Sequence, residues 1–315
     1  MIPELTSILT EGQGIMVVRS PNGKHDGEAI PFQAALAQMN SGDDRGQNLD
    51  SALDLIDRAA AAGARLVALP EVWPYLGPEE RNREHAEPIP GPITDILAER
   101  ARRHGVYIHG GSIYETRSGD PGMYNTAVVI DPHGEIIARY SKIHMFDVVL
   151  DGVAQYTESA TVSPGDELTV VEIDGFPVGL AICYDLRFPE IFRILALRGA
   201  RAVILPAAFT LTTGKDHWEM LIRARAIENG MYMMAPAQWG KHHPGNWCYG
   251  RSMIVDPWGT VIATAPDGVG LAAGLIDPSR VTAVRRQVPS LANRRPEAYR
   301  WPEEAALLAG RYPGH

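Results

Sequence analysis

Cys183 is the residue of this sequence whose type and position offer the clearest chemistry. It follows the apolar run of residues 178–182 (VGLAI) and precedes the polar, proline-containing run of residues 184–190 (YDLRFPE). Such a boundary predicts a buried strand that ends just before the cysteine. Because open α/β folds place their chemistry at the carboxyl ends of strands, the thiol is a candidate nucleophile. The alternative is an inert core thiol, since free cysteines are usually buried.

A cysteine nucleophile needs partners, because its thiol becomes reactive when a nearby cation stabilises the thiolate or a base removes the proton. The two best candidates are Glu71, in the sequence ALPEVWPY, and Lys142, in RYSKIHMFD. Both follow apolar runs that resemble the strand predicted before Cys183. Taken singly, each is of a residue type that is usually solvated at the surface, so the indication comes from their similar positions.

The elements that must position these residues alternate between strands and helices, as is typical of an α/β fold. The helix at 216–229 is expected to open with a capping box made by Asp216 and Glu219. The organised part of the chain is expected to begin at residues 33–39. Helices are predicted at residues 47–62, 93–103, 191–198 and 216–229, and strands at residues 15–18, 65–71, 106–114, 126–131, 135–140, 178–182, 202–206, 232–235, 252–255 and 261–263.

Two stretches of the chain occur twice in the same order. Residues 63–70 (GARLVALP) match residues 199–206 (GARAVILP), and residues 128–134 (VVIDPHG) match residues 253–259 (MIVDPWG). The matches indicate two copies of one α/β unit, although turns of this kind also recur by chance. Two such halves predict a single domain with two packed sheets and outer helices, which is a four-layer α-β-β-α sandwich.

Composition narrows the possible partners. The chain has 315 residues and a formal net charge of −9, and it has no long basic cluster, which disfavours nucleic acid and anionic membranes. It has no apolar run of membrane-span length and no basic-then-apolar leader, so a cytoplasmic protein is expected. We expect an N-terminal extension at residues 1–31, the main domain at residues 32–288 and a polar C-terminal tail at residues 289–315.

Other motifs give little support for a cofactor or a metal. The only cysteines are Cys183 and Cys248, with no C-x-x-C pair, and Cys248 is expected to be structural. The glycine-rich run of residues 268–274 lacks the spacing and the following helix of a nucleotide loop. Adjacent His242 and His243 point in opposite directions on an extended chain, so they are a poor metal pair. No G-x-S-x-G elbow is present.

The run GLAICYDLRFPE around Cys183 resembles the nitrilase superfamily, the carbon-nitrogen hydrolases, and within it the Nit-type amidases. The runs HWEMLIRARAIEN at residues 217–229 and DPWGTV at residues 256–261 add to this resemblance. It implies the four-layer fold and a catalytic triad of Glu71, Lys142 and Cys183. True nitrilases usually carry tryptophan after the nucleophile, so Tyr184 favours amides over nitriles.

The charges of the three side chains indicate the role of each residue of the triad. Glu71 is expected to act as the general base, and Lys142 is expected to stabilise the oxyanion together with the backbone N–H of Tyr184. Cys183 then carries a thioester that water hydrolyses. Glu158, in YTESATVSPGD, aligns with the additional glutamate of Nit-like proteins, although a surface loop is an equal alternative for it.

Substrate recognition is expected from Arg187, Phe209 and Thr213, which fall where the family lines its acyl pocket. The Arg187 guanidinium can bind a carboxylate, or it can form a structural ion pair with Asp185 or Glu190. The predicted substrate is a small carboxylate-bearing amide, such as an ω-amide of a 2-oxo acid or an amide of the deaminated glutathione type.

Three alternatives to this function remain, and an assembly is expected. The alternatives are an N-carbamoyl amidohydrolase, a nitrilase on the same scaffold, and a non-catalytic binding protein of the same fold. The tail contains Tyr299 and Trp301 among arginines, a composition common at interfaces. Together with the family's habit of dimerising, it predicts a homodimer, with the tail at the oligomer interface.

Overall fold

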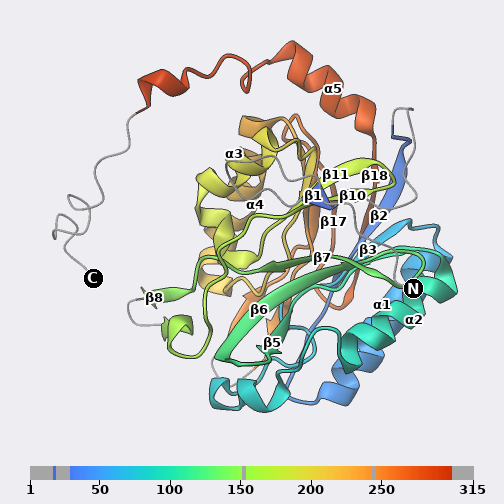
Figure 1. Ribbon diagram of the computed structural model, residues 1–315, viewed down its shortest axis with the longest axis vertical. Helices are drawn as coiled ribbons and strands as arrows, with labels where there is room; N and C mark the ends of the chain where they lie inside the picture. The colour runs from blue at the N-terminus through green and yellow to red at the C-terminus, as the bar shows by residue number, and fades with distance from the viewer. Residues whose placement is uncertain (1–16, 19–28, 151–153, 243–245, 300–315) are drawn as a thin grey trace.

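Two seven-stranded mixed sheets form the centre of the computed structural model (Figure 1), which describes residues 17–18, 29–150, 154–242 and 246–299. The first sheet has the order β1 (Val17–Val18), β10 (Val170–Ile173), β11 (Phe176–Leu180), β12 (Ala202–Ile204), β13 (Tyr232–Ala235), β16 (Met253–Val255) and β17 (Val261–Thr264). The second has the order β18 (Gly270–Ile276), β2 (Phe32–Gln38), β3 (Leu66–Ala68), β4 (Tyr107–His109), β6 (Asp120–Ile130) and β5 (Ile113–Arg117), with β7 (Ile136–Ser141) also paired to β6.

The two sheets share one sequence of strand pairings. In the second sheet β2, β3 and β4 are parallel, and β6 and β7 follow as antiparallel strands. In the first sheet β11, β12 and β13 are parallel, and β16 and β17 follow in the same way. The repeated turns also agree, because Asp131 N donates to Glu135 O at 2.9 Å and Asp256 N donates to Thr260 O at 2.9 Å. The repeated sequences therefore occupy equivalent places in the two sheets.

Helices and short hairpins complete the described part of the chain. The α-helices are α1 (Arg45–Ala61), α2 (Pro92–His104), α3 (Pro189–Leu197), α4 (Leu211–Asn229) and α5 (Pro278–Gln287), and the 3₁₀ turns are η1 (Glu79–His85), η2 (Glu158–Ala160), η3 (Cys183–Arg187) and η4 (Pro296–Ala298). The hairpins are β8 (Asp147–Leu150) with β9 (Ala154–Thr157) and β14 (Trp239–Lys241) with β15 (Trp247–Tyr249). No helix within these residues is long and apolar enough to cross a bilayer.

Two predicted elements differ from the structure. The predicted capping box of Asp216 and Glu219 is wrong, because α4 begins at Leu211 and both residues lie inside the helix. The residue before the helix, Thr210, forms an isolated antiparallel β-bridge with Cys248. The strand predicted at residues 106–114 is divided into β4 and β5. Gly111 interrupts it with a φ of +63°, and a Cβ there would lie 2.1 Å from the Pro70 carbonyl oxygen, so the backbone must bend at this glycine.

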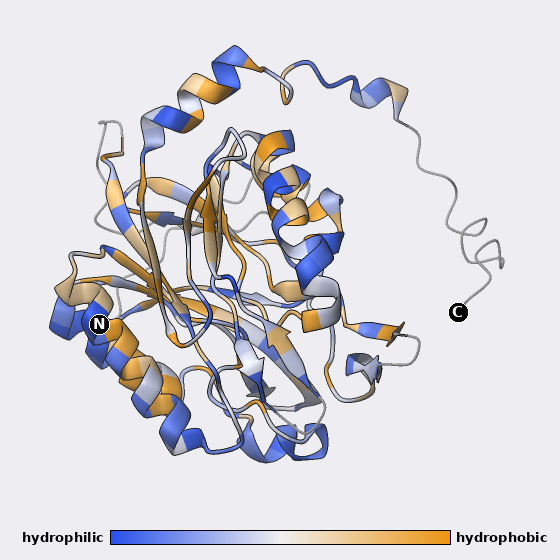
Figure 2. Cartoon of the chain, turned by 180° about the vertical axis from the view of Figure 1, so that it is seen from behind, coloured by the Kyte–Doolittle hydropathy of each residue, from blue (hydrophilic) through white to orange (hydrophobic). Residues whose placement is uncertain are grey.

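Side chains of the central strands alternate between two apolar clusters. Leu66 and Ala68 of β3 join the cluster that contains Val178 of β11, so part of this cluster lies between the sheets, and the same cluster extends to Phe192 of α3 and Trp218 of α4. Val67 of β3 belongs to a second cluster, with Leu55 of α1 and Leu97 of α2. Figure 2 shows the apolar character of the central strands and the mixed faces of the helices. The mixed α/β single-domain prediction is confirmed.

The turns after three strands bring the candidate residues toward one another. Glu71 follows β3, Lys142 follows β7 directly, and Cys183 follows β11 after two residues. Neighbouring turns are linked through the backbone, since Cys183 N donates to Pro206 O at 2.9 Å. The carboxyl ends of β3 and β11 therefore supply two of the side chains, and the end of a hairpin strand supplies the third.

Candidate active site

A cavity of about 150 Å³ contains most of the predicted site residues in its wall. These are Glu71, Lys142, Glu158, Cys183, Tyr184, Phe209 and Thr213. Arg187 is absent from the wall and lies half-buried beside it. Its guanidinium carbon is 5.2 Å from the centre of the Phe209 ring and 5.8 Å from that of Tyr184. The structure thus brings all the candidates except Arg187 to one cavity, and it places Arg187 behind two rings of that region.

Cys183 sits in a strained turn that begins as its strand ends. The residue is 8% exposed and has a φ of +45°, which is sparsely populated for a residue with a side chain. The turn is closed on both sides, because Ile182 N donates to Asp185 Oδ2 at 2.8 Å and Asp185 N donates to Ile182 O at 3.0 Å. Asp185 thereby fixes the direction in which the thiol points.

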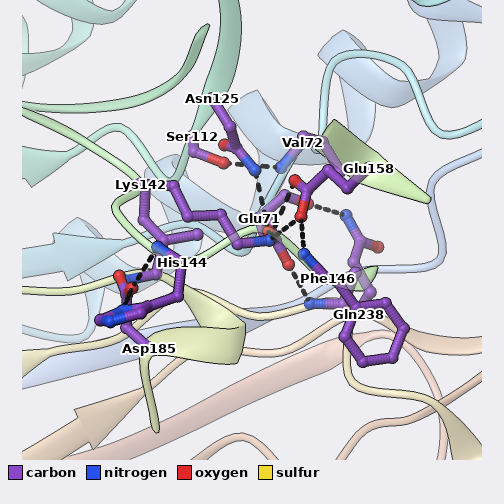
Figure 3. A network of polar contacts seen from close by, with 12 residues as sticks. Glu71, Val72, Ser112, Asn125, Lys142, His144, Phe146, Glu158, Asp185 and Gln238 are labelled. Atoms are coloured by element: carbon purple, nitrogen blue, oxygen red, sulfur yellow. Dashed lines mark hydrogen bonds and ion pairs between the residues drawn. The ribbon is translucent and has the colours of Figure 1, made fainter. Parts of the chain in front are cut away.

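Glu71 is held through both its side chain and its backbone (Figure 3). The carboxylate, 4% exposed, accepts hydrogen bonds from Asn125 Nδ2 at 2.9 Å and from Ala208 N at 2.8 Å. Gln238 Nε2 donates to the Glu71 carbonyl at 3.1 Å, and Ser112 Oγ accepts from the next amide, Val72 N, at 3.0 Å. The base candidate is therefore fixed in position before any substrate binds.

Lys142 lies between two carboxylates (Figure 3). Its ammonium, on a side chain 2% exposed, is 3.1 Å from Glu71 Oε1 and 2.8 Å from Glu158 Oε2. Phe146 N donates to the same Glu158 oxygen at 2.7 Å, so Glu158 is itself fixed. The three ionised side chains carry a net charge of −1. Glu158 lies in a surface turn, as the alternative from the sequence had it, but the turn η2 directs its side chain inward to Lys142.

Electrostatics favour a protonated thiol and a charged lysine. Burial, the negative charge of Glu71 and a hydrogen bond to it raise the pKa of Cys183, while Lys142 opposes the rise. Burial alone would lower the pKa of Lys142, but the charges of Glu158, Glu71 and Cys183 raise it well above its ordinary value. The resting thiol therefore needs a base to remove its proton, and Lys142 cannot be that base.

Several residues of the cavity wall were not expected from the sequence. Asn125 and Ala208 contact Glu71 directly, and Cys248 lines the cavity although it was expected to be only structural. Burial raises the pKa of Cys248 as well, so it is no more acidic than an ordinary thiol. His242 also lines the wall, whereas His243 lies outside the described residues. Among the residues with described positions, no group of three or more His, Cys, Asp or Glu side chains is placed to hold a metal ion.

The sequence carried no signal for most of these contacts. Ala208 acts through its backbone N–H, which any residue except proline provides. Asn125 stands in the middle of the long strand β6 and belongs to none of the motifs around the triad. The apolar pattern of the sequence could reveal only those site residues that directly follow a strand, because the ends of neighbouring strands meet at one edge of a sheet.

Comparison with known proteins supports a family assignment. The family model described as carbon-nitrogen hydrolase matches residues 33–286 of the chain. The deaminated glutathione amidase of Synechocystis sp. (strain PCC 6803 / GT-S) is 45% identical over 267 residues, which cover 84% of this chain and 98% of that protein. The omega-amidase NIT2 of Homo sapiens is 38% identical over 270 residues, which cover 85% of this chain and 96% of that protein.

Solved structures are similar over the same extent. The C. elegans NitFhit protein superposes with a TM-score of 0.80 at 35% identity, covering 86% of this chain and 67% of that one. A mutant of the amidase from Nesterenkonia sp. AN1 has a TM-score of 0.70 at 26% identity, covering 87% of this chain and 97% of that one. That structure shows covalent addition of the acetamide moiety of fluoroacetamide at the active site cysteine.

Proposed function

This chain belongs to the carbon-nitrogen hydrolase family, and we propose that it hydrolyses a small carboxylate-bearing amide through a thioester on Cys183. It is a hydrolase of non-peptide carbon-nitrogen bonds, in line with relatives named deaminated glutathione amidase and omega-amidase. The observation that carries the proposal is the Lys142 ammonium, 3.1 Å from Glu71 Oε1 and 2.8 Å from Glu158 Oε2, in the wall of the cavity that contains Cys183.

The reaction begins with removal of the thiol proton. Glu71 is the base, because its carboxylate lines the same cavity as the Cys183 thiol, whose pKa is raised by burial and by the charge of Glu71. The sulfur attacks the amide carbon, and the carbonyl oxygen takes up negative charge. Lys142 and the backbone N–H of Tyr184 are the proposed donors to that oxygen.

The proton transfer changes the surroundings of Lys142. In the resting site its ammonium contacts both Glu71 and Glu158. When Glu71 takes the thiol proton it becomes neutral, and its attraction for the ammonium falls. Lys142 is then free to turn one N–H toward the new oxyanion, while Glu158 keeps the side chain in place. The general base and the oxyanion donor are thereby coupled.

The second half of the reaction reverses these roles. Glu71 returns its proton to the nitrogen, so that ammonia leaves as the carbon-nitrogen bond breaks and the thioester forms. Glu71, now a carboxylate again, takes a proton from water, and the resulting hydroxide attacks the thioester. The acid is released as the carbon-sulfur bond breaks, and Glu71 returns the proton that it took from water to the sulfur, so the thiol of Cys183 is restored.

The carboxylate of the substrate is assigned to the Arg187 side of the cavity. The ion pairs considered for Arg187 with Asp185 and Glu190 are not present among the described residues, since Asp185 pairs with His144 instead. The weak contacts of Arg187 with His217 Nδ1, at 3.4 and 3.5 Å, leave its guanidinium able to bind an anion. Phe209 and Thr213 of the wall are the proposed contacts of the acyl chain.

An ammonia-release assay tests the function. The purified protein is given ω-amides of 2-oxo acids, neutral amides, N-carbamoyl compounds and nitriles at equal concentrations. Faster turnover of the carboxylate-bearing amides supports the proposal. Faster turnover of carbamoyl compounds or nitriles would favour the alternative enzymes, and absence of turnover for every class would favour a non-catalytic protein.

Three further points extend the proposal. The two sheets with α1 and α2 beyond one and α3 and α4 beyond the other are assigned to a four-layer α-β-β-α sandwich. A homodimer is proposed from exposed apolar residues on α3 and α4, including Leu197 and Met220, and from exposed Tyr299 of the tail, whereas Trp301 lies outside the described residues. A cytoplasmic location suits two free cysteines, one of them a nucleophile. The domain boundaries at residues 32 and 288 remain predictions.

A further inference from the structure

Asn125 contacts both Glu71 and Lys142, the two proposed partners of the Cys183 thiol. Its side chain is 1% exposed, and its Nδ2 donates to Glu71 Oε1 at 2.9 Å (Figure 3). The amide orientation follows from chemistry, since a carboxylate oxygen only accepts. The backbone carbonyl of Asn125 accepts from Lys142 N at 2.9 Å. One residue of β6 therefore contacts both Glu71 and the backbone of Lys142.

The other end of the Asn125 amide, its oxygen, has no partner in the described part of the chain. Its Oδ1 is buried and accepts no hydrogen bond among the residues described. Buried polar atoms are nearly always paired, because leaving one unpaired costs free energy. If this side chain served only to fill space, leucine would fill it without leaving a buried polar atom unpaired. The amide therefore contributes through its hydrogen bond to Glu71. Sites where local rules are broken in this way are commonly functional.

The two oxygens of Glu71 have different surroundings. Oε1 accepts from Asn125 Nδ2 at 2.9 Å and from Lys142 Nζ at 3.1 Å. Oε2 accepts from a single donor, Ala208 N at 2.8 Å, and Ala208 lies with Cys183 in the wall of the cavity. Oε1 is therefore occupied by two side-chain donors, which leaves Oε2, with one donor, as the oxygen better able to accept the thiol proton.

We propose that Asn125 is a positioning residue that holds Glu71 Oε1, so that Oε2 is the oxygen that carries the proton. The proposal rests on the proposed function and adds to it the atom that acts. In the first step the Sγ–H bond breaks and an Oε2–H bond forms. In the next, the Oε2–H bond breaks as an N–H bond forms on the departing ammonia. Asn125 itself neither gains nor loses a proton in either step.

Two substitutions of the same size test this role. Asn125→Leu removes the donor, and Asn125→Asp replaces it with an oxygen that repels Glu71. We expect Asn125→Leu to lower kcat roughly 10- to 100-fold with little change in KM, because the base is misoriented and the substrate contacts are kept. The acidic limb of the kcat/KM profile moves to higher pH, since a carboxylate that loses a donor binds a proton more readily. The Asn125→Asp effect is larger.

Thr126→Val is the matched control. Thr126 is the next residue of β6, is equally buried, and donates to a buried carboxylate outside the site, Glu115 Oε2, at 2.7 Å. The control is expected to lower thermal stability without moving kcat or the pH profile. If Asn125→Leu behaves like Thr126→Val, with kcat and the acidic limb unchanged, the positioning role is overturned.

A second readout separates this proposal from the proposed function. The rate of alkylation of Cys183 by iodoacetamide reports removal of the thiol proton without any amide substrate, and Cys248 in the same cavity is the internal reference. We expect Asn125→Leu to slow alkylation of Cys183 at neutral pH and leave that of Cys248 unchanged. Unchanged alkylation of Cys183 contradicts the role of Asn125, even if no tested amide is hydrolysed by the wild-type protein.

Discussion

The Asp185 carboxylate accepts two hydrogen bonds from His144, one from the backbone N at 3.1 Å and one from Nδ1 at 2.9 Å. His144 lies two residues after Lys142, and Asp185 lies two residues after Cys183. The other oxygen of Asp185 accepts from Tyr140 Oη at 2.6 Å, two residues before Lys142. A single buried carboxylate therefore fixes the nucleophile turn against both sides of the lysine segment.

Asp185→Asn is expected to lower kcat at least 10-fold while the protein remains folded. Asparagine has the same size, but its NH₂ group replaces one carboxylate oxygen and cannot accept. Either the contacts with His144 or those with Tyr140 and Ile182 are therefore lost, and the distance between the thiol and Lys142 is no longer fixed. Steady-state kinetics and far-UV circular dichroism measure the two effects. Asp131→Asn is the control, since Asp131 also accepts backbone N–H groups in a turn, from His133 and Glu135, but lies in the turn between β6 and β7. A kcat loss equal in both variants would contradict the role of Asp185.

Cys183→Ala and Cys183→Ser are expected to abolish amide hydrolysis while the melting temperature stays within a few degrees of the wild type. The reason is that each change is small and leaves the hydrogen bonds of the turn in place. Ammonia release and thermal unfolding measure the two properties. Cys248→Ala, in the same cavity wall, is the control and should retain turnover. Turnover by purified Cys183→Ala would refute the thioester mechanism.

His109 gives the protein an acid-sensitive stability. Burial lowers the pKa of His109 from 6.5 to about 3, and Nδ1 accepts from Gly111 N at 3.2 Å. Below pH 6.5 the unfolded chain binds a proton that the folded chain does not, so the free energy of unfolding falls as the pH falls toward 3. Each pH unit in that window costs about 1.4 kcal/mol, or roughly 2 kcal/mol between pH 6.5 and pH 5.

Urea unfolding of the wild type and His109→Asn at pH 7 and pH 5 measures this contribution. Asparagine can place an oxygen near the position of Nδ1 and keep the contact with Gly111, but it does not titrate. We expect the variant to be less stable at pH 7, where the smaller side chain leaves a void, and to lose less stability on acidification. An equal loss in both proteins would show that His109 does not cause it.

The sequence reveals the parts of this site that depend on regular structure. Strand ends are visible in an apolar pattern, so Glu71, Lys142 and Cys183 could be identified together, and the repeated GAR and DP motifs predicted the equivalent strands. The start of α4 was missed because the apparent cap at Asp216 lies within the helix. The hydrogen bond from Asn125 to Glu71 and the one from His144 to Asp185 could not be predicted from the sequence. They join residues that are 54 and 41 positions apart, and they depend on side-chain geometry.

If the protein is a homodimer, charged residues introduced on the exposed face of α4 should dissociate it into monomers. Met220 and Ile227 of α4 are 72% and 53% exposed and lie two turns apart on one face of the helix, so a second copy of the chain packed there would remove both from water. The double variant Met220→Asp with Ile227→Asp is expected to be monomeric at micromolar concentration by light scattering. Val149→Asp, a similarly exposed change on β8, is the control and should remain dimeric. A monomeric wild type would contradict the proposal directly.

The last prediction concerns the substrate carboxylate and Arg187. The guanidinium lies beside Phe209, which lines the cavity, but it is not itself part of the wall. A substrate carboxylate must therefore extend past the Phe209 ring to reach it, which favours an acid one short chain away from the amide carbon. Arg187→Met keeps the unbranched apolar stem and loses the guanidinium, so we expect KM for carboxylate-bearing amides to rise roughly 10- to 100-fold, as a lost charge-assisted hydrogen bond predicts. KM for a neutral amide of similar size should change little, and this comparison is the control for a general loss of packing. If the preference for carboxylate-bearing amides survives Arg187→Met, another group recognises the acid, and the assignment of Arg187 is wrong.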